Sequence, residues 1–110
     1  MTKYFKEIDD GNVSQDLLDK LDEARGIAGI PFIITSAYRT PEHNAEVGGV
    51  PNSSHIKGLA VDIRVKDSVT RYKVLHSLIS AGFDRIGIAN TFIHCDIDPD
   101  KASGVIWDYS

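Results

Sequence analysis

The run from Leu59 to Val65 alternates strictly, with a large aliphatic side chain at every second position. Successive residues of a strand point to opposite faces, so the run predicts a β-strand with one face suited to burial in a core. Asp62 belongs to the other face. Aspartate is disfavoured inside strands, so its presence needs a reason. An exposed sheet face is one explanation, and a functional role is another.

A second alternating run, from Phe92 to Asp98, repeats this pattern. Its apolar positions include Cys95, which we interpret as a small buried hydrophobic residue and not as a ligand or nucleophile. The opposite face carries three polar side chains, namely His94, Asp96 and Asp98. The run therefore predicts a second strand whose acidic face also holds a histidine.

The loop before the first run contributes His55, seven residues before Asp62. If the two strands are neighbours, His55, Asp62 and His94 can converge. Two imidazoles and one carboxylate leave the fourth tetrahedral position for water, which is typical of a catalytic zinc site. Zinc lowers the pKa of such a water and polarises a carbonyl, as amide hydrolysis requires. Spacing alone also permits an ordinary polar surface.

The remaining sequence indicates a mixed fold. Pro41 at a first helical turn and Gly82 after an amphipathic run mark helix boundaries. Ser68 opens that run, whose predicted apolar stripe comprises Val69, Tyr72, Leu75, Leu78 and Ile79. A helix is expected to begin at Ser14 and to be ended by Gly26 and Gly29, and further helices are expected at 41–47 and 68–81. Strands are expected at 31–36, 59–65, 83–89 and 92–98. The form of segment 105–107 stays open.

Length and charge narrow the class of protein. The 110 residues suffice for one domain, which we place at 1–110. A net charge of −4 without a basic stripe argues against nucleic-acid binding. The sequence has no long apolar run for a membrane span, and a single cysteine excludes an internal disulfide. We therefore expect a monomer that binds neither nucleic acid nor a membrane.

Five segments of the sequence carry a family resemblance, and they are, in chain order, Ser36–Thr40, Asn44, Val47–Gly49, Asn52–Ile63 and Phe92–Asp96. The pattern Ser-x-His-x-x-Gly-x-Ala-x-Asp, from Ser53 to Asp62, is the most specific part. Together these segments closely resemble the M15 metallopeptidases. This family includes D-alanyl-D-alanine carboxypeptidases, D-Ala-D-Ala dipeptidases and phage endolysin peptidases, and it shares a zinc fold with the hedgehog signalling domain.

The resemblance implies that His55, Asp62 and His94 bind one zinc ion. It also implies that Arg39 lies beside the metal, where it binds substrate or stabilises the oxyanion. Many family members carry an acidic general base three residues before the last zinc histidine, but this sequence has Thr91 there. Asp96 is the nearest substitute by our reasoning, either as the base or as a partner that orients His94. Asp98 is a weaker candidate for the base.

The expected fold is a single α+β domain, with a small, mostly antiparallel sheet, helices on one face and the zinc site on the other. The expected function is a zinc peptidase acting on peptidoglycan stem peptides, as a D,D-carboxypeptidase or an endopeptidase. The alternative is a zinc-binding but non-catalytic hedgehog-like domain, or a phage structural or interaction domain. Because the first residues do not resemble a secretory signal, we expect synthesis in the cytoplasm and phage-type release to the cell wall.

Overall fold

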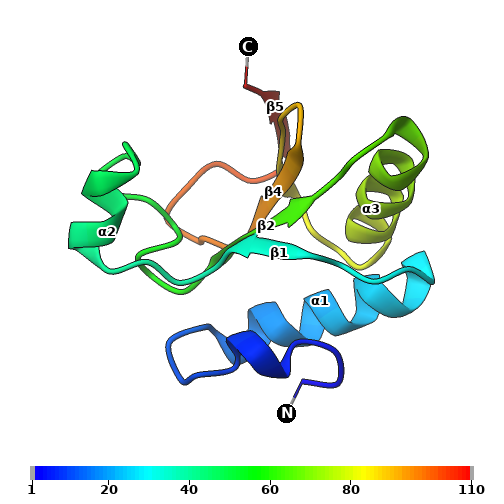
Figure 1. Ribbon diagram of the computed structural model, residues 1–110, viewed down its shortest axis with the longest axis horizontal. Helices are drawn as coiled ribbons and strands as arrows, with labels where there is room; N and C mark the ends of the chain where they lie inside the picture. The colour runs from blue at the N-terminus through cyan, green and yellow to red at the C-terminus, as the bar shows by residue number, and fades with distance from the viewer. Residues whose placement is uncertain (1, 110) are drawn as a thin grey trace.

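The computed structural model describes residues 2–109, and a five-stranded sheet forms its centre (Figure 1). The strand order is β1-β2-β4-β3-β5. All neighbouring pairs are antiparallel except β3 and β5, which are parallel. The strands span Ile34–Ser36 (β1), Ala60–Arg64 (β2), Arg85–Ile88 (β3), Phe92–Asp96 (β4) and Val105–Asp108 (β5). The two strands predicted to carry Asp62 and His94 are therefore direct neighbours.

Two long helices, α1 (Gln15–Ala28) and α3 (Ser68–Ser80), pack against each other and against the sheet. The short helix α2 (Pro41–Glu46) lies apart from them, beyond the end of β1 (Figure 1). A 3-10 turn, η1 (Lys6–Ile8), precedes α1. The side chain of Thr40 accepts a hydrogen bond from the His43 backbone N–H and so caps α2. This confirms the predicted α+β class with helices on one face of the sheet.

One hydrophobic cluster fills the space between the sheet and the two long helices. The aliphatic face of β2 and the apolar face of β4 enter this cluster, as the alternation predicts. Cys95 is fully buried there, and burial raises the pKa of its thiol well above the ordinary value. Cys95 is thus a core residue, and its thiol stays protonated.

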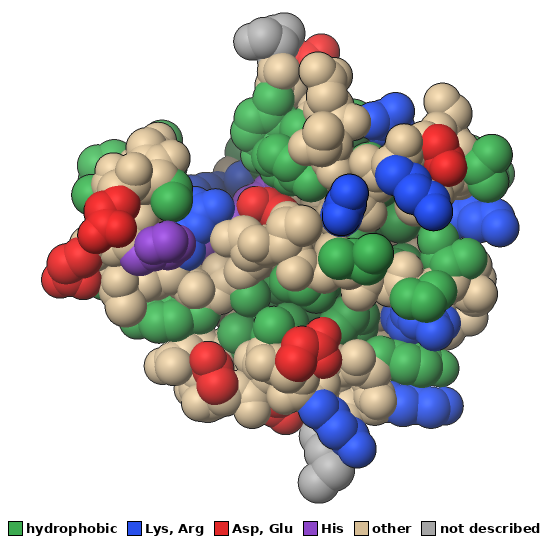
Figure 2. All heavy atoms as spheres, in the orientation of Figure 1, with side chains coloured by type: hydrophobic (Ala, Val, Ile, Leu, Met, Phe, Trp, Pro, Cys, Tyr) green, Lys and Arg blue, Asp and Glu red, His purple; other side chains and the backbone are tan. Residues whose placement is uncertain are grey.

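The predicted apolar stripe of α3 is wrong for three of its five members. Val69, Tyr72 and Ile79 are each more than half exposed, while Leu78 is buried and Leu75 partly buried. Val74 and Ser77 lie on the buried face instead. Figure 2 shows hydrophobic side chains interspersed with lysine and arginine over this side of the molecule. The buried face of α3 is therefore narrower than the apolar pattern of its sequence predicts.

On the opposite face of the sheet, one row of paired residues runs across the strands. The register sets Asp62 opposite both Ser36 and His94, His94 opposite Gly87, and Gly87 opposite Trp107. All five strands contribute one residue to this row. The face away from the core thus carries polar groups at its centre and an aromatic residue at one edge.

Within residues 2–109, no helix combines the length and the apolar character that crossing a bilayer requires.

Candidate metal centre

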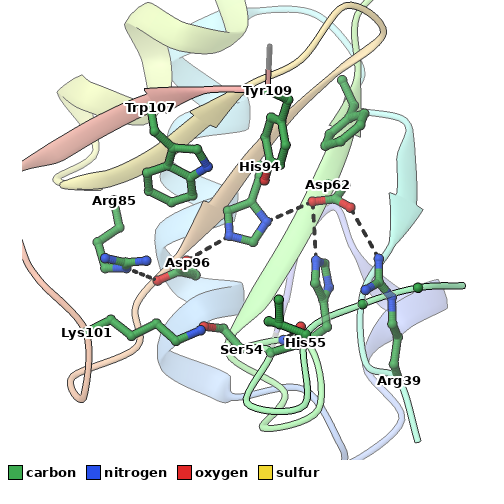
Figure 3. A pocket seen from close by; sticks show the side chains of 15 residues that line it. Arg39, Ser54, His55, Asp62, Arg85, His94, Asp96, Lys101, Trp107 and Tyr109 are labelled. Carbon is green, nitrogen blue, oxygen red and sulfur yellow. Dashed lines mark hydrogen bonds and ion pairs between the residues drawn. The ribbon is translucent and has the colours of Figure 1, made fainter. Parts of the chain in front are cut away.

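His55, Asp62 and His94 converge at the polar face of the sheet (Figure 3). The distance from Asp62 Oδ1 is 3.3 Å to His55 Nε2 and 2.9 Å to His94 Nδ1. One ligand atom from each of the three residues can be chosen such that all lie within 4.8 Å of one another. All three residues are buried. Two imidazole nitrogens and one carboxylate oxygen are a donor set that fits a divalent metal with one open position.

The ring of His55 is oriented by the backbone. Its Nδ1 lies 2.8 Å from the carbonyl oxygen of Ala37. A carbonyl can only accept, so Nδ1 carries the proton and donates it. Nε2 is then left with a free lone pair directed toward Asp62. This fixes the tautomer that a metal ligand needs.

The ring of His94 is held between two carboxylates. Its Nδ1 faces Asp62, and its Nε2 lies 2.7 Å from Asp96 Oδ2. The other oxygen of Asp96 accepts a 2.6 Å hydrogen bond from Arg85 Nε, and Arg85 Nη1 donates to the carbonyl of Ala102. The guanidinium of Arg85 also lies over the Trp107 ring. His94 thus has one nitrogen fixed by a buried chain of contacts and the other turned toward the site.

The charges of these residues shift their pKa values. Burial by itself raises the pKa of Asp62, but its close contacts with His55 and His94 outweigh this effect and lower it to about 2. Burial lowers the pKa of His94, but its contacts with Asp62 and Asp96 overcome this and raise it. Asp62 is consequently an ionised carboxylate at neutral pH, as a metal ligand must be.

Arg39 lies beside the triad, as the resemblance implies. Its Nη2 is 3.7 Å from Asp62 Oδ2. Its Nε donates to Ser36 Oγ and its Nη1 to Asn44 Oδ1. These neutral partners hold the guanidinium in place without cancelling its charge. Arg39 therefore presents a fixed positive charge at the edge of the site.

The loop that carries His55 is tied down at two points. Ser54 Oγ donates a 2.7 Å hydrogen bond to the buried carboxylate of Asp98, which also pairs with Lys57. On the other side, the Gly58 carbonyl accepts from the Ser14 backbone N–H at 2.8 Å. Asp98 is thus an anchor of this loop and not part of the polar row.

Gly58 cannot carry a side chain without moving its neighbours. Its φ is +72°, and an added Cβ would lie 1.9 Å from the Asn12 carbonyl oxygen. We expect Gly58→Ala to cost about 3 kcal/mol or more of unfolding free energy, measured by urea denaturation. Gly29→Ala is the matched control, because φ is +68° there and the space is open. A cost for Gly58→Ala equal to that of the control would contradict the steric argument.

The triad opens into a cavity of about 400 Å³. Its second wall comes from residues that the sequence reasoning did not select: Arg85, Lys101, Trp107 and Tyr109. Arg85 and Gly87 lie two residues apart on β3 and therefore share the face of the sheet that carries the triad. This alternation is only a weak signal in the sequence. Trp107 and Tyr109 reach the cavity because β5 pairs in parallel with β3. The sequence holds no local signal for this pairing.

Thr91 occupies the turn between β3 and β4 and is exposed. It is not among the described residues that line the cavity. The lining residues include two acidic side chains, Asp62 and Asp96. Position 91 therefore carries no acidic group, and Asp62 and Asp96 are the carboxylates on the described wall of the cavity.

An open His2Asp group beside a fixed arginine has the donor set and the neighbouring positive charge that metal-dependent hydrolases use. The family model Peptidase M15 matches residues 1–96, which is most of the chain. The protein belongs to the peptidase M15 family. A search of curated proteins returned no match. The matched range includes the triad and Arg39 and ends before Lys101, Trp107 and Tyr109.

Proposed function

We propose that this protein is a zinc-dependent peptidase that hydrolyses a peptide bond in the stem peptides of bacterial peptidoglycan. The observation that carries the proposal is the convergence of His55, Asp62 and His94 beside Arg39, in a chain of the M15 family. A zinc ion at these ligands would supply a water of lowered pKa and polarise the scissile carbonyl. The donor set, with two nitrogens, suits zinc better than calcium or magnesium.

The residues around the triad support a peptide substrate with anionic groups. Arg39 and Lys101 both line the cavity, although the chain as a whole is acidic. Stem peptides carry free carboxylates, and a guanidinium binds a carboxylate with two parallel hydrogen bonds. Arg39 would hold such a group or stabilise the oxyanion that develops on the carbonyl oxygen. D,D-carboxypeptidase and endopeptidase activities both fit this arrangement.

For Asp96 we propose a positioning role in preference to that of general base. One of its oxygens accepts from His94 Nε2, and the other accepts from Arg85 and from the Asp98 backbone N–H. Only 1% of the Asp96 side chain is exposed. A carboxylate engaged in this way orients the histidine and raises its basicity as a ligand.

The second candidate function is a non-catalytic metal-binding domain of the hedgehog type. It is favoured by one observation, namely that no acidic side chain on the described cavity wall other than Asp62 and Asp96 is available as a base. The peptidase proposal includes release of the protein to the cell wall by a phage-type route, and the non-catalytic alternative does not require it. The non-catalytic alternative predicts zinc binding of similar strength but no bond cleavage.

Mass spectrometry of defined muropeptides distinguishes the two functions. Zinc-loaded protein should convert at least one of them into two fragments whose combined mass exceeds the substrate by one water. The fragment masses identify the bond that is cut. Protein stripped with a chelator is the control, and zinc should restore its activity. If zinc-loaded protein leaves every muropeptide unchanged, the peptidase proposal is wrong.

A further inference from the structure

The cavity wall opposite Arg39 contains a hydroxyl group that the proposed mechanism does not yet use. Tyr109 lines the cavity, and its side chain extends toward His94 and Asp62 with the hydroxyl end nearest to them (Figure 3). It lies beyond the residues that the family model matches. The family match therefore assigns no role to Tyr109.

Three contacts position Tyr109. Its backbone N–H donates to the carbonyl of Ile88 at 3.1 Å, which extends the pairing of β5 with β3. Its ring packs against Phe92, with ring centroids 5.4 Å apart. Gly87 leaves the space for the ring, since a Cβ there would lie 2.9 Å from Tyr109 Cε2. The aromatic ring is thus fixed over β3, beside the strand that carries His94.

The surroundings also keep the hydroxyl protonated. Burial raises the pKa of Tyr109 above its ordinary value, which is already well above neutral pH. A phenol that keeps its proton at neutral pH is a hydrogen-bond donor. About half of the residue is exposed, so a ligand entering the cavity can reach it.

We propose that Tyr109 is a catalytic residue that donates a hydrogen bond from its hydroxyl to the substrate carbonyl oxygen as negative charge develops there. This rests on the proposed peptidase function. Water adds to the carbonyl carbon, the C–N bond breaks, and a proton from the water passes to the leaving amine. Tyr109 keeps its own proton throughout. Together with Arg39, it places a donor on each side of the triad, as oxyanion stabilisation requires.

Tyr109→Phe tests this role, because it removes one hydroxyl and keeps the ring that packs on Phe92. We expect kcat on the cleaved muropeptide to fall about 10- to 100-fold. KM and zinc affinity should stay at the wild-type values. Tyr72→Phe, on the exposed side of α3, is the matched control and should leave kcat unchanged. Unchanged kcat in Tyr109→Phe overturns the proposal.

A binding measurement tests the same hydroxyl without turnover. Acetohydroxamate is a small metal chelator that needs no peptide specificity, and its oxygens occupy the region where a carbonyl oxygen would lie. Calorimetry with zinc-loaded protein should show about tenfold weaker binding to Tyr109→Phe, and wild-type affinity for Tyr72→Phe. Equal affinity in Tyr109→Phe and wild type overturns the proposal. If wild type cleaves no muropeptide, the peptidase proposal fails separately, and this measurement still decides whether Tyr109 donates.

Discussion

Asp62→Asn should abolish peptidase activity and weaken zinc binding by more than about 100-fold, which exceeds the usual effect of changing a partner outside the ligand set. Asp62 supplies the negative charge among the three proposed ligands, and both histidines approach its Oδ1. An amide has almost the same shape, so the change removes charge with little change in packing. Competition with a chromophoric chelator measures the zinc affinity.

Asp84→Asn serves as the control for this substitution. Asp84 is exposed and precedes β3, so its loss should alter neither zinc affinity nor cleavage. Circular dichroism of the zinc-free proteins should show that both variants fold. Wild-type zinc affinity in Asp62→Asn would remove Asp62 from the ligand set and leave the metal proposal without its anionic ligand.

Arg85→Met should produce the second large effect, on stability and on zinc affinity together. Arg85 is the cation that pairs with the buried Asp96 carboxylate. Removing one partner of a buried ion pair costs about 3–5 kcal/mol. Because Asp96 also orients His94, zinc affinity should fall by about 10- to 100-fold. Urea denaturation and chelator competition measure the two effects.

Arg85→Lys separates the two roles of this residue. Lysine keeps the positive charge near Asp96 and should recover part of both losses, although it cannot reproduce the separate contacts of Nε and Nη1. Arg64→Met, at an exposed position on β2, controls for the loss of an arginine. If Arg85→Met is less stable but binds zinc as tightly as wild type, Arg85 supports the fold and does not position His94.

Strand alternation was sufficient to predict much of the site. It set Asp62 and His94 on the polar faces of their strands and Cys95 in the core, because one buried face fixes the direction of every side chain in a strand. Arg39 came from family resemblance, and the structure places it next to Asp62. The roles of these residues in binding and catalysis stay predictions.

Other features depend on pairings between distant segments, which no local pattern encodes. Val69, Tyr72 and Ile79 of α3 fit a helical apolar stripe, yet α1 and the sheet cover a face centred on Val74 and Leu78. Trp107 reaches the site because β5 pairs in parallel with β3. Arg85 meets Asp96 through the pairing of β3 with β4. Each of these contacts requires knowledge of the tertiary arrangement.

The cross-strand pairing of Asp62 with His94 has a consequence for how the chain folds. A slip of β4 by one residue would set Asp62 against Ile93 or Cys95 and turn His94 toward the helices. A metal ion that needs both side chains can bind only the correctly paired sheet. Zinc present during refolding would therefore select against misregistered chains, since its binding energy is available to a single register. A metal ion bound at this site would therefore also act as a check on the strand register of the folded protein.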